Sequence, residues 1–132
     1  MILVDTSALL PYLKGKETAA SVFLQRTLDE DVEIALTPWI AQEVIQGARD
    51  ETEWRTLRRY LSSQRMIHLA DQLRSHLEAA RIYYECRRRG LTVRSSVDCI
   101  VAQTALEHSV PLLHGDRDYE AIQQVRPLKT LP

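Results

Sequence analysis

Short apolar runs alternate along the chain with longer stretches in which apolar residues recur every three or four positions. The run Ile-Leu-Val at 2–4 contains no polar side chain, which is typical of a strand buried on both faces. We predict further strands at 33–36 and 110–113 and a short extended piece at 66–69. We predict helices at 7–13, 19–28, 38–47, 51–61, 71–89, from Ser95 or Ser96 to about 106, and at 119–124. This alternation indicates an α/β fold, in which a small parallel β-sheet is flanked by helices in three layers and joined by right-handed crossovers.

Local signals mark the ends and the apolar sides of several helices. Thr37 followed by Pro38 is a strong helix start, because Thr caps the first N–H groups and Pro fits the first helical position. Gly90 stands where the longest helix should end. In each of two helices, apolar residues recur at helical spacing and therefore lie along one side of the helix. These rows are Ala19, Val22 and Phe23 in the second helix and Leu73, Leu77, Ala80 and Tyr84 in the longest one.

Composition narrows the class of protein. The chain has 132 residues, 45% hydrophobic and 27% charged, which fits one domain spanning 1–132. No apolar run approaches the roughly 18 residues of a membrane span, so no membrane contact is expected. The opening has no basic segment and reaches a carboxylate at Asp5, unlike a secretory signal. Cys86 and Cys99 cannot frame a disulfide scaffold, and we interpret them as reduced thiols of a cytoplasmic protein.

Charge is nearly balanced overall but unevenly distributed. Seventeen Lys and Arg against eighteen Asp and Glu give a net charge of −1, which does not indicate a nucleic-acid binder. The segment 81–94 nevertheless carries five arginines, two tyrosines and a single acid, Glu85. Such a segment can hold phosphates and stack bases. It can equally be a solvated helix end whose cations favour the negative pole of the helix dipole.

Four acidic residues lie just after predicted strands or within apolar stretches: Asp5, Glu43, Asp98 and Asp116. Each has a purely structural explanation. Asp5 can cap the next helix, Glu43 can be an ordinary solvated helical side chain, and Ser95-x-x-Asp98 matches a capping box. Asp116 and its neighbour Asp118 can each cap the last helix.

Taken together, the acids indicate a metal site. Residues that end parallel strands meet at one edge of the sheet, so three of these aspartates should converge there. Like charges held close together are costly unless a cation neutralises them or a proton is taken up. A cluster of oxygen donors without paired His or Cys favours Mg²⁺ or Mn²⁺ over zinc. Setting four carboxylates aside for metal leaves 17 cations facing 14 anions, which no longer argues against nucleic acid.

Other chemistries have weaker support. The four histidines, at 68, 76, 108 and 114, lack the spacing of zinc ligands. No Gly-x-Ser-x-Gly nucleophile elbow is present, and the carboxylate beside Cys99 disfavours its thiolate. The favoured mechanism is therefore hydrolysis by metal-activated water, with no covalent enzyme intermediate.

Four segments resemble one family over essentially the whole chain. They are Met-Ile-Leu-Val-Asp-Thr-Ser-Ala-Leu at 1–9, Ile-Ala-Gln-Glu-Val at 40–44, Ser-Val-Asp-Cys-Ile-Val-Ala at 96–102 and Asp-Arg-Asp-Tyr at 116–119. The pattern resembles PIN-domain ribonucleases, above all the VapC toxins of bacterial toxin–antitoxin pairs. The resemblance implies a PIN-like, Rossmann-like fold and a Mg²⁺-dependent endoribonuclease (Mn²⁺ being the alternative ion) that cuts RNA. It also implies a cognate antitoxin and a homodimer or toxin–antitoxin hetero-oligomer.

The resemblance assigns roles position by position. It makes Asp5, Glu43, Asp98 and Asp116 the catalytic acids, with Asp5, Asp98 and Asp116 as metal ligands. Glu43 would order a metal-bound water or bind a second ion, and Ser7 and Asp118 would support the ligands. The RNA-binding candidates are Arg87, Arg88, Arg89 and Arg94. The sequence departs from many relatives at His114, where they carry Thr or Ser, and a structural histidine is the favoured interpretation.

Two other functions remain open on the sequence. One is a non-catalytic RNA- or protein-binding module with a structural acidic Mg²⁺ site. The other is a phosphoryl-transfer enzyme or receiver-like switch, which needs a late lysine, and Lys129 is the only one. For an antitoxin, the exposed sides of the helices at 19–28 and 51–61 are candidate surfaces, with ordinary core packing as the alternative.

Overall fold

A five-stranded sheet forms the centre of the molecule. The computed structural model describes all residues, 1–132. Its strands are β1 (Ile2–Val4), β2 (Ile34–Leu36), β3 (Arg65–Met66), β4 (Leu112–Leu113) and β5 (Thr130–Leu131). They are arranged in the order β3-β2-β1-β4-β5, and every neighbouring pair is parallel. The predicted α/β class with a small parallel sheet is confirmed.

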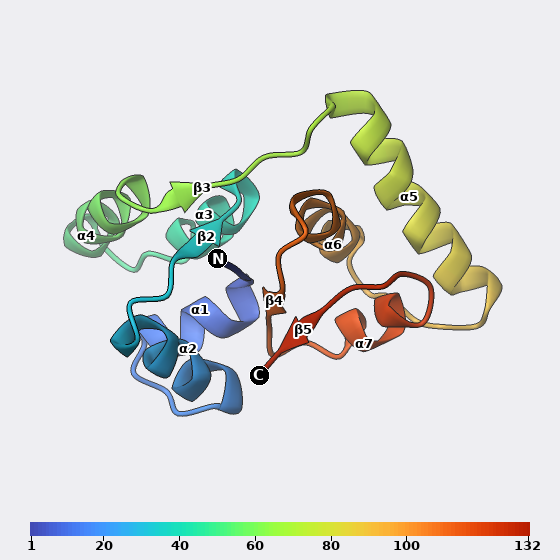
Figure 1. Ribbon diagram of the computed structural model, residues 1–132. Helices are drawn as coiled ribbons and strands as arrows, with labels where there is room; N and C mark the ends of the chain where they lie inside the picture. Colours follow the sequence, from blue (N-terminus) through green and yellow to red (C-terminus); the bar gives the residue numbers. More distant parts are fainter.

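Seven helices connect the strands and cover both faces of the sheet. They are α1 (Thr6–Leu13), α2 (Ala19–Asp29), α3 (Pro38–Ile45), α4 (Glu51–Ser62), α5 (Gln72–Arg88), α6 (Ser96–His108) and α7 (Asp118–Gln123). Their main contacts with one another form two groups, α1–α4 and α5–α7, which occupy the two halves of the molecule in Figure 1. The two groups lie on opposite sides of the sheet in Figure 1. This is what right-handed crossovers require, because the chain runs from β1 to β3 in one direction across the sheet and from β4 to β5 in the other.

The three central strands are buried because their sequences are continuously apolar. Leu3, Val4, Ala35, Leu112 and Leu113 have no exposed surface, as expected of a parallel sheet covered on both sides. The fifth strand was not predicted, since two residues after an irregular segment carry no periodic signal. It pairs with β4 at the edge of the sheet.

Capping residues set where the helices begin. The side chains of Thr37, Asp50 and Asp71 each accept a hydrogen bond from the N–H group three residues later, which starts α3, α4 and α5. Gly90 follows the end of α5 with a φ of +72°, a conformation that glycine adopts without strain. The predicted signals at Thr37 and Gly90 are confirmed, whereas the caps Asp50 and Asp71 were not predicted.

Most residues of the apolar rows of α2 and α5 lie on the solvent side, although such a row usually marks the packed side of a helix; Phe23 is half-buried against the core. Val22 is 41% exposed, Leu73 is 69% exposed and Leu77 is 59% exposed. The buried sides carry Ala20, Ser21, Leu24 and Thr27 in α2 and Ser75, Ala79, Ile82 and Cys86 in α5. Leu24 and Ile82 are the large apolar side chains that enter the core, their neighbours on the packed sides are smaller, and α5 packs mainly against α6.

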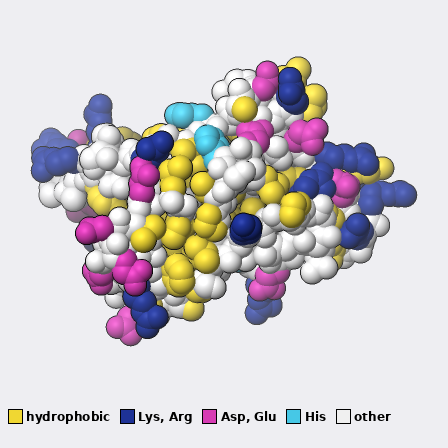
Figure 2. Space-filling model, viewed as in Figure 1, with side chains coloured by type: hydrophobic (Ala, Val, Ile, Leu, Met, Phe, Trp, Pro, Cys, Tyr) yellow, Lys and Arg dark blue, Asp and Glu magenta, His cyan; other side chains and the backbone are white.

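None of the helices combines the length and the apolar character that crossing a lipid bilayer requires. Figure 2 shows Lys and Arg side chains gathered over the C-terminal half of α5, with apolar atoms exposed near its first turns.

Candidate metal centre and active site

The four predicted acids come together at the carboxyl ends of the central strands. Asp5 directly follows β1 and Asp116 lies after β4, its neighbour in the sheet. Asp98 comes from the first turn of α6 and Glu43 from α3. All four line one cavity of about 420 Å³, together with Thr6, Ser7, Leu10, Pro11 and Ser95. The fold thus brings to one place residues separated by up to 111 positions (116 − 5).

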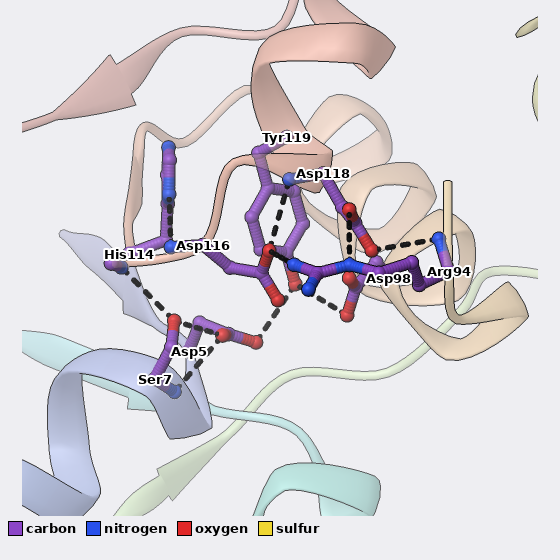
Figure 3. A network of polar contacts seen from close by, with 9 residues as sticks. Asp5, Ser7, Arg94, Asp98, His114, Asp116, Asp118 and Tyr119 are labelled. Atoms are coloured by element: carbon purple, nitrogen blue, oxygen red, sulfur yellow. Dashed lines mark hydrogen bonds and ion pairs between the residues drawn. The ribbon is translucent and has the colours of Figure 1, made fainter. Parts of the chain in front are cut away.

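The Asp5 carboxylate caps the N-terminus of α1 and also lines the cavity. Its Oδ2 accepts hydrogen bonds from the backbone N–H of Ser7, at 3.0 Å, and from the Ser7 hydroxyl. The capping interpretation of Asp5 is therefore correct, but the same carboxylate also faces the cavity. Ser7 Oγ in turn accepts a hydrogen bond from the N–H of Gly115, at 3.0 Å. Ser7 thereby joins the end of β1 to the loop that carries Asp116 (Figure 3).

Tyr119 connects Asp5 to Asp98. Its hydroxyl lies 2.8 Å from Asp5 Oδ1, to which it donates, and 3.4 Å from Asp98 Oδ1. The side chain has no exposed surface, and burial, followed by the charges of Asp5 and Asp98, raises the pKa of the phenol well above its usual range. The phenol therefore remains a neutral donor between two carboxylates. No role in the site was predicted for Tyr119; the signal that could have indicated one is that a buried tyrosine hydroxyl needs a polar partner.

Asp98 carries the unpartnered oxygen of the site. Its Oδ2 is buried and accepts no hydrogen bond. Burial and then the neighbouring charges of Asp5, Asp116 and Asp118 raise the pKa of Asp98 to about 8. The predicted capping box does not form, since the Ser95 hydroxyl accepts from Val97 N–H while the Asp98 side chain turns into the cavity.

The tightest group of carboxylates differs from the predicted one. One oxygen each of Asp98, Asp116 and Asp118 lies within 4.8 Å of the others, whereas Asp5 approaches this group through Tyr119. Asp118 is 5% exposed and accepts hydrogen bonds from the backbone N–H of Arg94 at 2.9 Å and from its Nε at 3.2 Å. Its N–H donates to Asp116 Oδ1 at 2.9 Å, so Asp118 belongs to the cluster itself and does not cap α7 with its side chain.

Glu43 projects from α3 and lines the same cavity as the three aspartates. The hydroxyl of Thr6 donates to Glu43 Oε1 at 3.1 Å. Partial burial is the main cause that raises the pKa of Glu43; the hydrogen bond from Thr6 opposes this shift and the charge of Asp5 adds to it. A carboxylate with a raised pKa beside other carboxylates is suited to accepting a proton.

His114 has the structural role that the sequence favoured. Its Nδ1 accepts a hydrogen bond from the N–H of Asp116 at 3.1 Å, and its ring packs against Tyr119 with centroids 4.7 Å apart. Burial is the main cause that lowers the pKa of the imidazole. Because its Nδ1 accepts the hydrogen bond from Asp116 N–H, the histidine stabilises the backbone conformation of the loop at Asp116.

The predicted RNA-binding arginines separate into two places. Arg94 touches the acidic cluster, with one guanidinium nitrogen 3.2 Å from Asp116 Oδ1 and Nε 3.2 Å from Asp118 Oδ1 (Figure 3). Arg89 instead donates to the carbonyl of Gln124 at 2.8 Å. Arg87 and Arg88 are exposed in the last turn of α5 and form no ion pair.

The donor set fits a divalent metal ion. The cavity presents carboxylate oxygens and no nitrogen or sulfur ligand, as Mg²⁺ and Mn²⁺ prefer. The orphaned Oδ2 of Asp98 is a buried oxygen that a cation would satisfy. Cys99 lies next in sequence, but burial raises the pKa of its thiol to about 12, so it supplies neither a nucleophile nor a thiolate ligand.

Known proteins share both the sequence and the fold. Residues 2–125 match the PIN domain family. The chain is 35% identical to the VapC ribonuclease Mb1587 of Mycobacterium bovis, over 130 residues that cover 98% of the chain and 96% of the relative. It shows the same identity and coverage with ribonuclease VapC11 of Mycobacterium tuberculosis.

Solved structures agree at lower identity. FitAcB from Neisseria gonorrhoeae superposes with a TM-score of 0.70 at 17% identity, covering 100% of this chain and 97% of that one. VapBC2 from Rickettsia felis, bound to a DNA fragment from its promoter, gives a TM-score of 0.73 at 16% identity over 99% and 98% of the two chains. Sequence and fold together lead to one conclusion: this chain belongs to the PIN-domain family.

Proposed function

We propose that this protein is a divalent-metal-dependent endoribonuclease that hydrolyses phosphodiester bonds in RNA. The observation that carries the proposal is the buried, unpartnered Asp98 Oδ2 within a cluster of carboxylates, because such an arrangement is stable only with a cation or a proton. The close relatives are themselves named VapC ribonucleases, which supports the same reaction for this chain.

In the proposed mechanism, the carboxylates of Asp98 and Asp116 would hold the ion together with Asp5, which the Tyr119 hydroxyl links to Asp98. Mg²⁺ or Mn²⁺ in such a site supplies Lewis acidity, which acidifies water and offsets the negative charge of a phosphodiester. Tyr119 holds Asp5 and Asp98 in fixed orientation through its hydroxyl. Glu43 lies in the same cavity and accepts the proton of the attacking water, and Thr6 orients its carboxylate.

Asp118 holds Arg94 against the cluster through two hydrogen bonds, and this role differs from a simple cap. Ser7 fixes the Asp5 carboxylate and the Gly115 loop at the same time. Both residues therefore act by positioning the acids. The receiver-like alternative loses support, because the only late lysine, Lys129, is exposed beside the edge strand β5 and lines none of the cavity.

We also propose that the protein is the toxin of a toxin–antitoxin pair. The structural neighbours include VapBC complexes, and the relatives are VapC proteins. The exposed apolar side of α2, around Val22, is a candidate surface for the antitoxin, as is α4, where Trp54 is 40% exposed. The proposal includes one domain spanning 1–132, a homodimer or toxin–antitoxin hetero-oligomer, and action on RNA in the cytoplasm.

The test is an RNA cleavage assay with the purified protein and Glu43→Gln. Wild type should cut in Mg²⁺ or Mn²⁺ and stop cutting when EDTA removes the ion. Glu43→Gln keeps the acceptor for Thr6 and should lower the cleavage rate about 100-fold or more, the scale of a lost proton acceptor. Glu53→Gln changes a half-buried glutamate of α4 that does not line the cavity; purified in parallel, it controls for contaminating nucleases.

Each outcome of the assay leads to a different conclusion. Cleavage that persists in EDTA refutes metal dependence. A folded wild type that binds Mg²⁺ but cuts no RNA in either ion would instead support a non-catalytic module with a structural metal site.

A further inference from the structure

A second pocket adjoins the acidic cavity. It has a volume of about 650 Å³ and shares Ser7 and Asp116 with the cavity, so the two spaces lie on either side of the same loop. No hydrophobic residue lines it. Its lining consists of Ser7, Thr92, Arg94, Gly115, Asp116, Arg117 and Asp118.

Two arginines supply the cationic hydrogen-bond donors of this pocket, beside the carboxylates of Asp116 and Asp118. Arg94 is anchored through its ion pairs with Asp116 and Asp118, yet its side chain is 70% exposed, so the guanidinium presents its remaining N–H donors to solvent. Arg117 is exposed and forms no ion pair. Figure 3 shows the Arg94 guanidinium lying across the carboxylates of Asp116 and Asp118.

An acidic site that acts on a polyanion needs cations beside it. The phosphate that is cut faces the carboxylates and any bound ion, whereas the next phosphate along the strand has no such ion and would be repelled. In this pocket the unpaired guanidinium of Arg117 and the free N–H donors of Arg94, whose charge offsets Asp116 and Asp118, offer that second phosphate charge-assisted hydrogen bonds.

We propose that this pocket binds the phosphodiester next to the one that is cut, through Arg94 and Arg117. The inference rests on the proposed ribonuclease function and adds the residues that hold the RNA strand in position relative to the carboxylates.

Arg94 has a further effect, because its positive charge already neutralises part of the cluster. Removing that charge makes the site more negative and should therefore tighten binding of a divalent ion.

The experiment measures RNA and metal affinity separately. A fluorescein-labelled, mixed-sequence single-stranded RNA is titrated by anisotropy in Ca²⁺ at several salt concentrations, and a denaturing gel checks that the probe stays intact. Calorimetry then gives the Mn²⁺ affinity of the protein without RNA. The variants are Arg117→Gln, Arg94→Gln and Arg94→Lys. Arg58→Gln is the matched control, since Arg58 is also exposed and unpaired but lies in α4, in the other half of the molecule.

Arg117→Gln should weaken RNA binding about fivefold or more and reduce the salt slope by about 0.7, the value for one lost phosphate contact on a single strand. It should leave Mn²⁺ affinity unchanged. Arg94→Gln should weaken RNA binding similarly while tightening Mn²⁺ binding several-fold. Arg94→Lys should restore the wild-type Mn²⁺ affinity, since it retains the charge. Arg58→Gln should match wild type in both measurements.

Unchanged RNA affinity and salt slope in Arg117→Gln would overturn the proposed subsite, even if Arg94→Gln fails to fold. The ribonuclease proposal would then still stand if the wild type cuts RNA in Mg²⁺. A wild type that neither binds nor cuts RNA would overturn both. Equal losses in Arg58→Gln would show diffuse attraction to the basic surface and also reject a specific pocket.

Discussion

Replacing Asp98 by Asn should abolish hydrolysis and yet make the metal-free protein more stable. In most enzymes and structural sites, loss of a buried polar residue costs stability. Here the native state holds a carboxylate whose Oδ2 has no partner and whose pKa is raised from 3.8 to about 8 by burial and neighbouring charges. The folded chain therefore opposes ionisation of this group, whereas the unfolded chain does not.

The size of the effect follows from this difference in pKa. At 1.36 kcal/mol for each pKa unit, the cost of the ionisable group at pH 7 has an upper limit of about 4 kcal/mol. Solvent reaches the half-buried side chain, and a neutral Asn loses about 0.5 kcal/mol of favourable interaction with the N-terminus of α6. The net stabilisation should be about 1–3 kcal/mol, or a rise in Tm of roughly 3–10 °C for a domain of this size.

Thermal unfolding in EDTA measures the effect directly, with Asp71→Asn as the matched control. Asp71 caps α5 through the N–H of Arg74, and Asn caps a helix as well as Asp does, so that variant should unfold within about 0.5 kcal/mol of wild type. Adding Mg²⁺ or Mn²⁺ should raise the Tm of wild type and of the control but not that of Asp98→Asn. A metal-free Asp98→Asn that melts below wild type would refute the argument that charge repulsion dominates this site.

Three further expectations test other contacts. Tyr119→Phe removes the donor between Asp5 and Asp98 and should cost about 1–2 kcal/mol in denaturant unfolding of the metal-free protein; no loss would mean that water replaces the hydroxyl. Because Asp98 binds its proton more tightly in the folded chain, its contribution to stability is complete below pH 4 and is lost as the pH rises toward about 8. The advantage of Asp98→Asn over wild type, followed by melting in EDTA, should therefore grow from pH 4 to pH 8, and a constant difference would contradict this. Gly115→Ala places a Cβ 3.3 Å from the carbonyl oxygen of Ser7, and displacement of this loop should weaken Mn²⁺ binding several-fold in calorimetry; wild-type affinity would show that the loop yields without cost.

Much of the fold could be predicted because its central strands are continuously apolar. Runs such as Leu3-Val4 and Leu112-Leu113 predict buried parallel strands without any tertiary information. The two-residue strand β5 could not be predicted, since its conformation comes from pairing with β4. The buried sides of α2 and α5 could not be predicted from the rows of large apolar residues, because smaller residues such as Ala79 share the interior with Leu24 and Ile82.

The site shows the same division between local and tertiary information. Acids that end predicted strands could be placed at one edge of the sheet, and the structure brings all four into one cavity. Two sets of contacts could not be predicted: the hydrogen bond from the Tyr119 hydroxyl to Asp5 and the hydrogen bonds from Arg94 to Asp118. They join residues that only folding brings together, so no spacing in the sequence reveals them.

The order of the strands has a consequence for synthesis of the chain. β1 and Asp5 are made well before β4, which must pair with β1, and before the Asp116–Tyr119 turn, which is 111 positions (116 − 5) further along the chain. Until then a nascent chain carries isolated carboxylates and no assembled centre. If the protein cuts RNA as proposed, a nascent chain cannot damage any transcript until this turn has been made, and products truncated before Asp116 should be inert.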